Sequence, residues 1–275
     1  MKIISLTDDL NTRNGLLSEH GLSFYFEADE KKYLFDTGSS EKFLHNANRL
    51  KINISDVDAL FISHNHYDHI GGLTYFMEVN KKAKIYIRSD SIYSTYYMRD
   101  CIKCPLGKFY KELAELDRVI FVDDFLQVDN LYLLSDTNGN KDFFCQGSDF
   151  IMEKDEQMVK DDFTHELFLV YIKDSKANIL SACSHRGIIN IIETTKNRFN
   201  LPINTLAAGL HLSKNNGMDI NCTPEYYNNL RDYLKGADIN RIYTCHCTGQ
   251  YAYNLLKADL GGNIDYFYTG SRIEI

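Results

Sequence analysis

The sequence predicts a layered fold in which β-strands and α-helices alternate along a chain of 275 residues. Three observations support this prediction. Short apolar runs follow one another closely at the start of the chain, strand-like and helix-like segments alternate after them, and four apolar runs end at or just before a histidine.

Three strand-like runs open the chain, at residues 2–5, 22–27 and 33–35. Their close succession predicts antiparallel strands at the start of a sheet. After a short turn, residues 40–50 have the pattern of a helix with Ser40 as its N-terminal cap. Only three prolines occur and no low-complexity tract interrupts the chain, so we predict a single domain over residues 1–275.

The segment from about residue 90 to residue 163 is less regular. It carries a cluster of tyrosines, Tyr93, Tyr96 and Tyr97, and turn residues at 138–140. Two interpretations stay open at this point: an insertion that covers the substrate, or a weakly patterned part of the sheet.

Four of the nine histidines stand at the end of an apolar, strand-like run. The runs cover residues 59–64, 178–185, 205–211 and 241–246 and end at His64, His185, His211 and His246. In α/β sheets the loops that follow the carboxyl ends of strands converge on one site. We therefore expect these histidines to share one site assembled from distant segments.

Composition and charge narrow the range of functions. The 30 Lys and Arg against 38 Asp and Glu give a net charge of -8, which disfavours nucleic acid, because phosphates are bound mainly by clustered Lys and Arg. The N-terminus lacks a secretory apolar segment, and no apolar run approaches the roughly 20 residues of a membrane span. The seven cysteines, an odd number, suggest reduced thiols. We expect a cytoplasmic protein with a small-molecule substrate and no membrane or nucleic-acid partner.

The strongest chemical signal is the segment His64-Asn-His66-Tyr-Asp68-His69, which follows an apolar strand and precedes a helix that opens near residues 70–72. Two residues at positions i and i+2 of an extended turn can direct two imidazoles at one ion. Asp68 and His69 can then face a neighbouring position. Neutral imidazole and carboxylate suit zinc, iron and manganese, so the segment predicts a metal site that holds two ions.

This segment matches the H-x-H-x-D-H signature of the metallo-β-lactamase superfamily, which the chain resembles over nearly its whole length. Asp36, in Phe-Asp-Thr-Gly, resembles the family's upstream aspartate, which supports the metal loop by hydrogen bonding. The resemblance implies one domain with an αββα sandwich: two packed mixed β-sheets, helices on their outer faces and the metals at one edge.

The resemblance also implies a set of metal ligands, which are in chain order His64, His66, Asp68, His69, His185 and His246. The first two would hold one ion, and the next two together with His246 would hold the other. The third histidine of the first ion stays open between His165 and His185, and we expect His185 to be a ligand in either case. No aspartate stands at the family's metal-bridging place.

Three short strings, at residues 183–188, 209–212 and 245–249, resemble the superfamily branch named after dihydropterin ribofuranosyl-aminobenzene phosphate synthase. Two of these strings precede predicted helices, at residues 188–199 and 251–260. Amides at a helix N-terminus favour anions, so Arg186, Thr248 and Gly249 are candidates for binding a phosphate or carboxylate.

Together these features predict a metal-dependent hydrolase that uses a metal-bound hydroxide on a small, phosphate- or carboxylate-bearing substrate. Asp68 would orient the hydroxide and accept its proton, and His211 would contact the substrate or protonate the leaving group. We expect two divalent ions, with zinc first and manganese or iron as alternatives. The rival functions are a dihydropterin-type synthase or transferase, a di-iron oxidoreductase and a non-catalytic binder of small molecules.

Overall fold

The computed structural model describes the chain except for residues 101, 108–114, 136, 138, 146–149 and 215–216. The chain divides into two compact units, each built from separate stretches of sequence. Unit 1 comprises Met1–Asp123, Ser148–Leu167 and Tyr268–Ile275, and unit 2 comprises Asp124–Gly147 and Phe168–Phe267. The prediction that residues 1–275 form a single domain stays a prediction.

The main sheet of unit 1 has seven strands in the order β20-β1-β2-β3-β4-β5-β8. Their bounds are Arg272–Glu274, Lys2–Thr7, Ser23–Ala28, Lys31–Phe35, Ala59–Phe61, Lys84–Arg88 and Val119–Val122. The strands β1, β2 and β3 pair antiparallel, which confirms the prediction for the start of the chain. From β3 to β8 the pairing is parallel, so the sheet is mixed.

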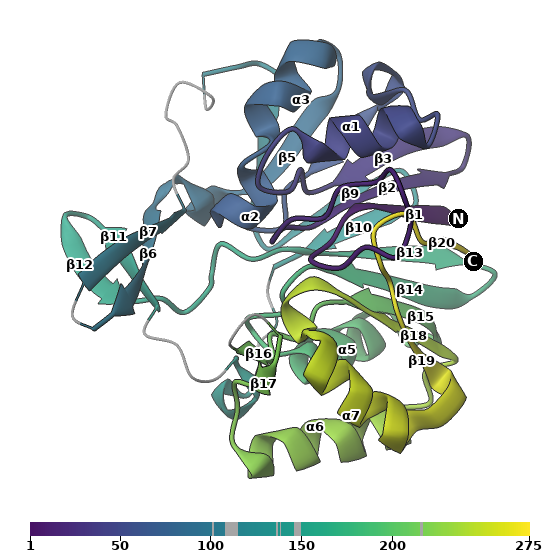
Figure 1. Cartoon of the computed structure of the whole chain (residues 1–275). Coiled ribbons are helices and arrows are strands. Elements are labelled where there is room, and N and C mark those ends of the chain that lie inside the picture. The colour runs from purple at the N-terminus through teal and green to yellow at the C-terminus, as the bar shows by residue number, and fades with distance from the viewer. Residues whose placement is uncertain (101, 108–114, 136, 138, 146–149, 215–216) are drawn as a thin grey trace. The chain divides into compact units, whose positions relative to one another are not determined.

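Two helices cover one face of this sheet, α1 (Lys42–Arg49) and α3 (Leu73–Val79) (Figure 1). Phe43 of α1 and Phe76 of α3 are fully buried in a core with residues of the central strands. Helix α1 begins two residues later than predicted, and the prediction of Ser40 as its cap is wrong: the N-cap is Glu41, whose side chain makes no capping bond. Ser40 precedes it and accepts from the amide of Lys42 at 3.3 Å. On the other face, aromatic rings contact one another across four strands, namely Phe26, Tyr33, Phe61 and Tyr86.

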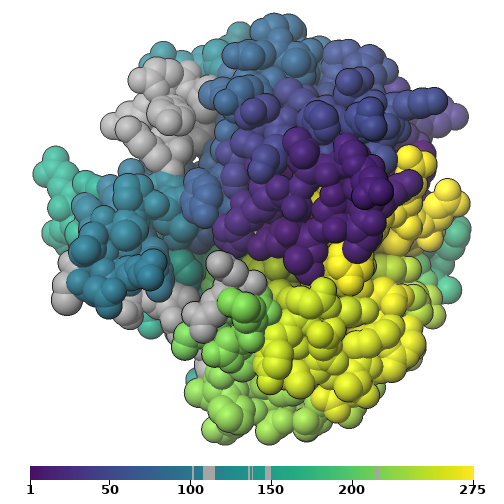
Figure 2. All heavy atoms as spheres, in the orientation of Figure 1, coloured from purple at the N-terminus to yellow at the C-terminus, as the bar shows by residue number. Residues whose placement is uncertain are grey.

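Unit 1 also contains a four-stranded antiparallel sheet, in the order β12-β11-β6-β7. The bounds are Gln157–Lys160, Phe150–Lys154, Ser94–Arg99 and Ile102–Gly107, with a short 3-10 helix, η2, at Ser89–Ile92. Figure 2 shows the blue-green atoms of this sheet standing out from the surface of unit 1. The irregular segment at 90–163 contributes this small sheet and also strands of both large sheets: β8 of unit 1, and β9 (Phe125–Val128) and β10 (Leu131–Leu134) of unit 2. That the small sheet covers a substrate stays a prediction.

Unit 2 is built on a second seven-stranded mixed sheet, in the order β19-β18-β15-β14-β13-β10-β9. The strands span Ile264–Tyr266, Arg241–Thr244, Ile203–Ala208, Lys176–Ser181, Phe168–Lys173, Leu131–Leu134 and Phe125–Val128. A further pair, β16 (Ser213–Lys214) and β17 (Asp219–Ile220), lies beside the helix α7 (Gln250–Leu260). The 3-10 helices are η3 (Lys141–Phe143), η4 (His246–Thr248) and η5 (Gly261–Asn263).

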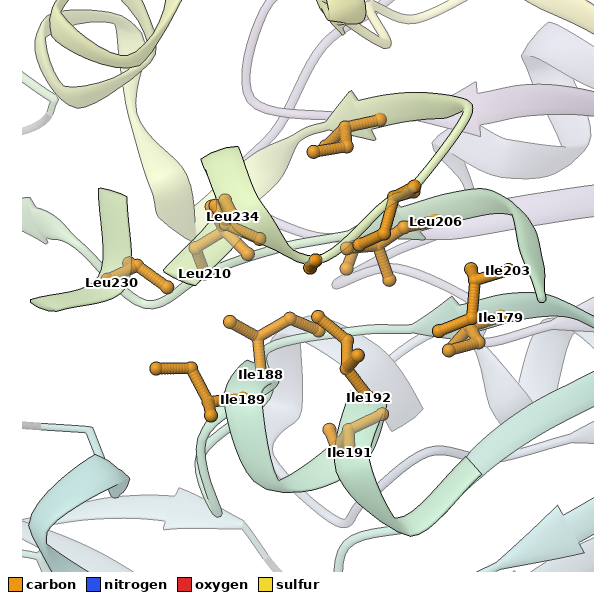
Figure 3. Close-up of a cluster of buried hydrophobic side chains, with 14 of the residues drawn as sticks. Ile179, Ile188, Ile189, Ile191, Ile192, Ile203, Leu206, Leu210, Leu230 and Leu234 are labelled. Carbon is orange, nitrogen blue, oxygen red and sulfur yellow. The ribbon is translucent and has the colours of Figure 1, made fainter. Parts of the chain in front are cut away.

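Three helices contribute to the core of unit 2: α5 (Ile188–Phe199), α6 (Pro224–Gly236) and α7 (Gln250–Leu260). Figure 3 shows isoleucines of α5 gathered near Leu206 of β15 and Leu234 of α6. These apolar contacts fix the strand β14, which precedes α5, against the rest of the sheet. Helix α5 has the predicted bounds, and α7 begins one residue before the predicted helix.

The structure confirms the predicted mixed α+β class, since each large sheet combines antiparallel and parallel pairs. Among the helices that the structure describes, none combines the length and apolar character needed to cross a bilayer.

Candidate metal centre

The metal loop of unit 1 runs from the end of β4 into the short helix α2 (Tyr67–Ile70). His64, His66, Asp68 and His69 are all buried. The centroid of the His64 ring lies 4.4 Å from that of His66 and 4.1 Å from that of His69. Three of the predicted ligands therefore form one compact group of imidazoles.

Backbone packing holds this loop in place. The carbonyl of His66 accepts from the amides of His69 and Ile70, which starts α2 directly after the second histidine. A Cβ atom on Gly71 would lie 2.4 Å from the carbonyl oxygen of Ser39, so only glycine allows this close approach. On the other side, the Asn65 amide donates to the carbonyls of Ser91 and Tyr93 at 3.0 and 2.7 Å and thereby ties the loop to η2.

Asp36 is buried behind the loop and has a positive φ of 60°. Its Oδ1 accepts from the Ser63 amide at 2.7 Å, and its Oδ2 accepts from the Ser63 hydroxyl at 2.6 Å. The same Oδ2 accepts from Nδ1 of His69 at 2.7 Å. Asp36 thus bonds to the residue before His64 and to His69, which orients the loop at both ends.

These bonds set the tautomers of two histidines. The Ser63 hydroxyl gives its proton to Asp36, so at 2.8 Å it accepts from Nδ1 of His64. Nδ1 of His69 likewise donates to Asp36. Each ring then carries its proton on Nδ1, and Nε2 is the nitrogen that offers a lone pair to a metal.

His165, which the sequence left open, lies in unit 1 with the metal loop. Its ring centroid is 6.0 Å from that of His64 and 5.4 Å from that of His66. Its Nε2 lies 3.1 Å from the buried carboxylate of Asp161. Its buried Nδ1 has no hydrogen-bond partner among the described residues. A carboxylate on one ring nitrogen and an unsatisfied second nitrogen form the arrangement of a metal-binding histidine.

Sequence reasoning missed Asp161 and also His20, which contacts Asp68. His20 Nε2 lies 3.3 Å from Asp68 Oδ2, and its Nδ1 lies 2.8 Å from Asp9 Oδ2. The His20 side chain is 55% exposed, whereas that of Asp68 is only 9% exposed. His20 therefore connects a buried carboxylate with solvent.

Burial and neighbouring charges shift the pKa values of His66 and His69 in opposite directions. Burial lowers the pKa of His66 well below its usual value, and the neighbouring His64 and His165 lower it further. Burial also opposes the charged form of His69, but Asp68 and Asp36 outweigh it and raise the pKa of His69 to about 9. His66 is thus neutral, the form that binds metals, whereas an ion at His69 must displace a proton.

In unit 2, the predicted histidines follow three adjacent parallel strands. His185 comes after β14, His211 after β15 and His246 after β18. The rings of His185 and His211 lie 4.4 Å apart. His211 and His246 have positive φ angles of 49° and 47°, a strained conformation for residues other than glycine. Such strain at strand ends is typical of functional sites.

The predicted anion-binding residues already have partners within unit 2. The buried hydroxyl of Thr248 accepts from the Leu210 amide at 2.9 Å and bonds the Thr244 hydroxyl at 2.6 Å. The Gly249 amide donates to the carbonyl of His246. Arg186 donates to the carbonyl of Ser135 at 2.8 Å. These bonds hold the strand ends together, and anion binding by the three residues stays a prediction.

Residues 19–187 match the model of the metallo-beta-lactamase superfamily. The chain belongs to this superfamily. Proteins with the superfamily's fold bind divalent metals, in keeping with the buried histidine group of unit 1.

Two relatives match nearly the whole chain, both from Methanocaldococcus jannaschii. The uncharacterized protein MJ0448 is 27% identical over 99% of this chain and 100% of its own length. The other is named 7,8-dihydropterin-6-methyl-4-(beta-D-ribofuranosyl)-aminobenzene-5'-phosphate synthase and is 26% identical over 100% of this chain and 96% of its own. The latter supports the predicted resemblance to that branch.

Solved structures of the superfamily confirm the fold. Tm1679, described as a metal-dependent hydrolase of the beta-lactamase superfamily, is 29% identical with a TM-score of 0.84, over 100% of this chain and 99% of its own. Zinc-bound PqqB from Methylobacterium extorquens has a TM-score of 0.62 at 12% identity, with both chains covered over 100% of their length. Because PqqB is only 12% identical to this chain, the comparison shows a shared fold and nothing more.

Proposed function

We propose that this protein is a metal-dependent hydrolase that acts on a small, anionic substrate. The observation that carries the proposal is the buried group of four imidazoles in unit 1, with the carboxylate of Asp68 beside it. Burying so many ionisable groups is costly unless they bind a common partner. A divalent cation is the partner that suits imidazole and carboxylate together.

The donors of unit 1 fit a metal in number and type. His64, His66 and His165 supply imidazoles, and Asp68 and His69 lie with Oδ2 and Nε2 3.6 Å apart. We propose two ions, zinc before manganese or iron. We propose His185 and His246 as further ligands because the superfamily resemblance implies them.

A divalent ion held by these residues would make water nucleophilic near neutral pH and polarise a carbonyl or phosphoryl oxygen. Asp68 is the base in this scheme, because its carboxylate lies at the edge of the histidine group and is almost fully buried. The proton that Asp68 accepts can pass to Nε2 of His20, which is 3.3 Å away and exposed to solvent. Asp9 stabilises the charged form of His20 from the other ring nitrogen.

A small-molecule substrate is favoured over nucleic acid by the net charge of -8. A second candidate function is a synthase or transferase reaction, and the observation that favours it is the synthase-named relative, 26% identical over the whole chain. Both reactions would use the same metal site, so they differ in whether water or a second substrate attacks. We propose a cytoplasmic location on the basis of the cysteine content.

The test is metal content by elemental mass spectrometry, on protein purified without chelator, together with a screen of phosphoesters and lactones. We expect at least two zinc ions per chain, and fewer ions and no hydrolysis in the His64→Ala/His66→Ala variant. His45→Ala, which alters an exposed histidine of unit 1, serves as the matched control. It should retain both the metal ions and the hydrolytic activity. Protein that takes up no metal under any loading condition would overturn the proposal, and iron with redox activity would replace it by an oxidoreductase.

His20→Ala is expected to lower kcat by about 10- to 100-fold while KM and metal content stay close to those of the unmodified protein. The reason is that Asp68 loses its contact with the exposed imidazole that passes its proton to solvent. Because the position is exposed, added imidazole should restore part of the activity. Steady-state kinetics with and without imidazole check this, with His45→Ala as control. Unchanged kcat in His20→Ala would show that the proton leaves by another route.

A further inference from the structure

Unit 2 contains a cluster of sulfur and nitrogen donors outside the metal loop. Cys183 follows β14, His211 follows β15, and Cys247 lies in η4 after β18. These strands are neighbours and run parallel, so their carboxyl ends lie at the same edge of the sheet. One ligand atom from each of the three residues lies within 4.8 Å of the other two.

We propose that Cys183, His211 and Cys247 bind one divalent ion of borderline softness, zinc or ferrous iron, within unit 2. Two thiolates and one imidazole select such ions over magnesium or calcium, which prefer oxygen. Two cysteines and one histidine are also a known catalytic zinc set, in which the fourth position stays open for water or substrate. His211 then acts as a ligand and not as the donor to a leaving group.

The backbone around Cys247 is shaped to hold a sulfur atom. The amide of His211 donates to the Cys247 sulfur at 3.3 Å, and this sulfur lies 3.8 Å from the carbonyl oxygen of Cys183. A Cβ on Gly209 would lie only 2.7 Å from the same sulfur, so glycine is needed at this position. Cys183 and Cys247 are both buried, which protects thiolates from oxidation.

The cluster offers His211 a second set of partners, Cys145 and His185, whose ligand atoms also lie within 4.8 Å of its own. In that set the Cys145 sulfur already lies 3.5 Å from Nδ1 of His185, and Cys145 is only half-buried. The set with Cys183 and Cys247 has two sulfurs, both buried, and is therefore the stronger one for a soft ion. Replacing Cys145 distinguishes the two sets.

The first experiment loads the full chain with cobalt(II) and records its absorption spectrum. Thiolate ligation should give an intense sulfur-to-cobalt charge-transfer band in the near ultraviolet, which nitrogen and oxygen ligands do not produce. The His64→Ala/His66→Ala variant should keep this band and one ion per chain, because the ligands belong to unit 2. A variant that keeps one ion without the band, or an unmodified protein that lacks the band, would overturn the inference and leave the proposed hydrolase untouched.

The second experiment identifies the sulfurs. Cys183→Ser and Cys247→Ser, each measured alone, should lower the charge-transfer absorption by about half or more, and the double variant should lose the band. Cys222→Ser, a half-buried cysteine of unit 2, is the matched control and should leave the spectrum unchanged. If Cys145→Ser loses the band and the double variant of Cys183 and Cys247 keeps it, the proposed ligand set of Cys183, His211 and Cys247 is wrong. Circular dichroism confirms that each variant is folded.

Discussion

Asp68→Asn is expected to lower kcat by about 10²- to 10⁴-fold on any substrate that the protein hydrolyses. Asparagine has the shape of aspartate but accepts no proton from water, and it offers His20 no negative charge. The histidines of the loop should stay in place because Asp36 and the backbone bonds of α2 hold them. We therefore expect the loss to fall mainly on kcat, with at least one ion retained.

Steady-state kinetics and elemental analysis on the same preparations check this prediction. Asp56→Asn is the matched control, since Asp56 carries the same charge in unit 1 but pairs at the surface with Lys32. It should retain full activity, because exposed ion pairs contribute little. An Asp68→Asn variant with normal kcat would show that Asp68 is not the base and would shift that role to another group.

The metal loop could be predicted from the sequence because its candidate ligands are close together in the chain. Three histidines and one aspartate stand within six residues, directly after an apolar strand, and the structure buries all four side chains. The same holds for the three histidines of unit 2, whose strands end just before them. An apolar run that ends in a turn fixes the end of a strand, and with it the position of the next side chain.

His20 and Asp161 could not be predicted, because each is an isolated polar residue whose partner is set by tertiary structure. His20 lies 48 positions before Asp68, and the strands β2, β3 and β4 and the helix α1 lie between them in the chain. Asp161 and His165 are close in sequence but lie in a loop without a periodic pattern. The importance of these two pairs follows from their contacts in the folded chain, which the sequence alone does not reveal.

The small four-stranded sheet of unit 1 could not be predicted either, because its strands pair with residues far away in the chain. Its strands β6 and β11 pair Tyr97 with Phe150, across more than fifty intervening residues. Strand β7 contains a proline, Pro105, and β12 is exposed at all four positions. Neither pattern predicts a strand by itself, since the pairing of distant partners decides the structure.

Asp36→Asn is expected to destabilise the metal-free protein by about 3–5 kcal/mol, since it breaks a buried ion pair and leaves buried donors without their acceptor. Asparagine tolerates the positive φ of 60° at this position, so the loss measures the charge and the hydrogen bonds and not backbone strain. We also expect metal affinity to fall by about 10- to 100-fold, because His69 is no longer oriented. Asp29→Asn is the matched control: it makes the same change at a positive φ of 50°, on an exposed residue of the same unit.

The dependence of stability on pH separates this effect from a simple packing defect. The pKa of His69 is raised to about 9, so its pairing with Asp68 and Asp36 stabilises the metal-free fold fully below a pH of about 6.5. That contribution is lost as the pH rises through 9. Asp36→Asn removes one of the two carboxylates, so denaturant unfolding between pH 6 and 10 should show a smaller decline than in the unmodified protein. An equal decline in both proteins would assign the raised pKa to Asp68 alone and reduce Asp36 to a hydrogen-bond acceptor that positions the loop.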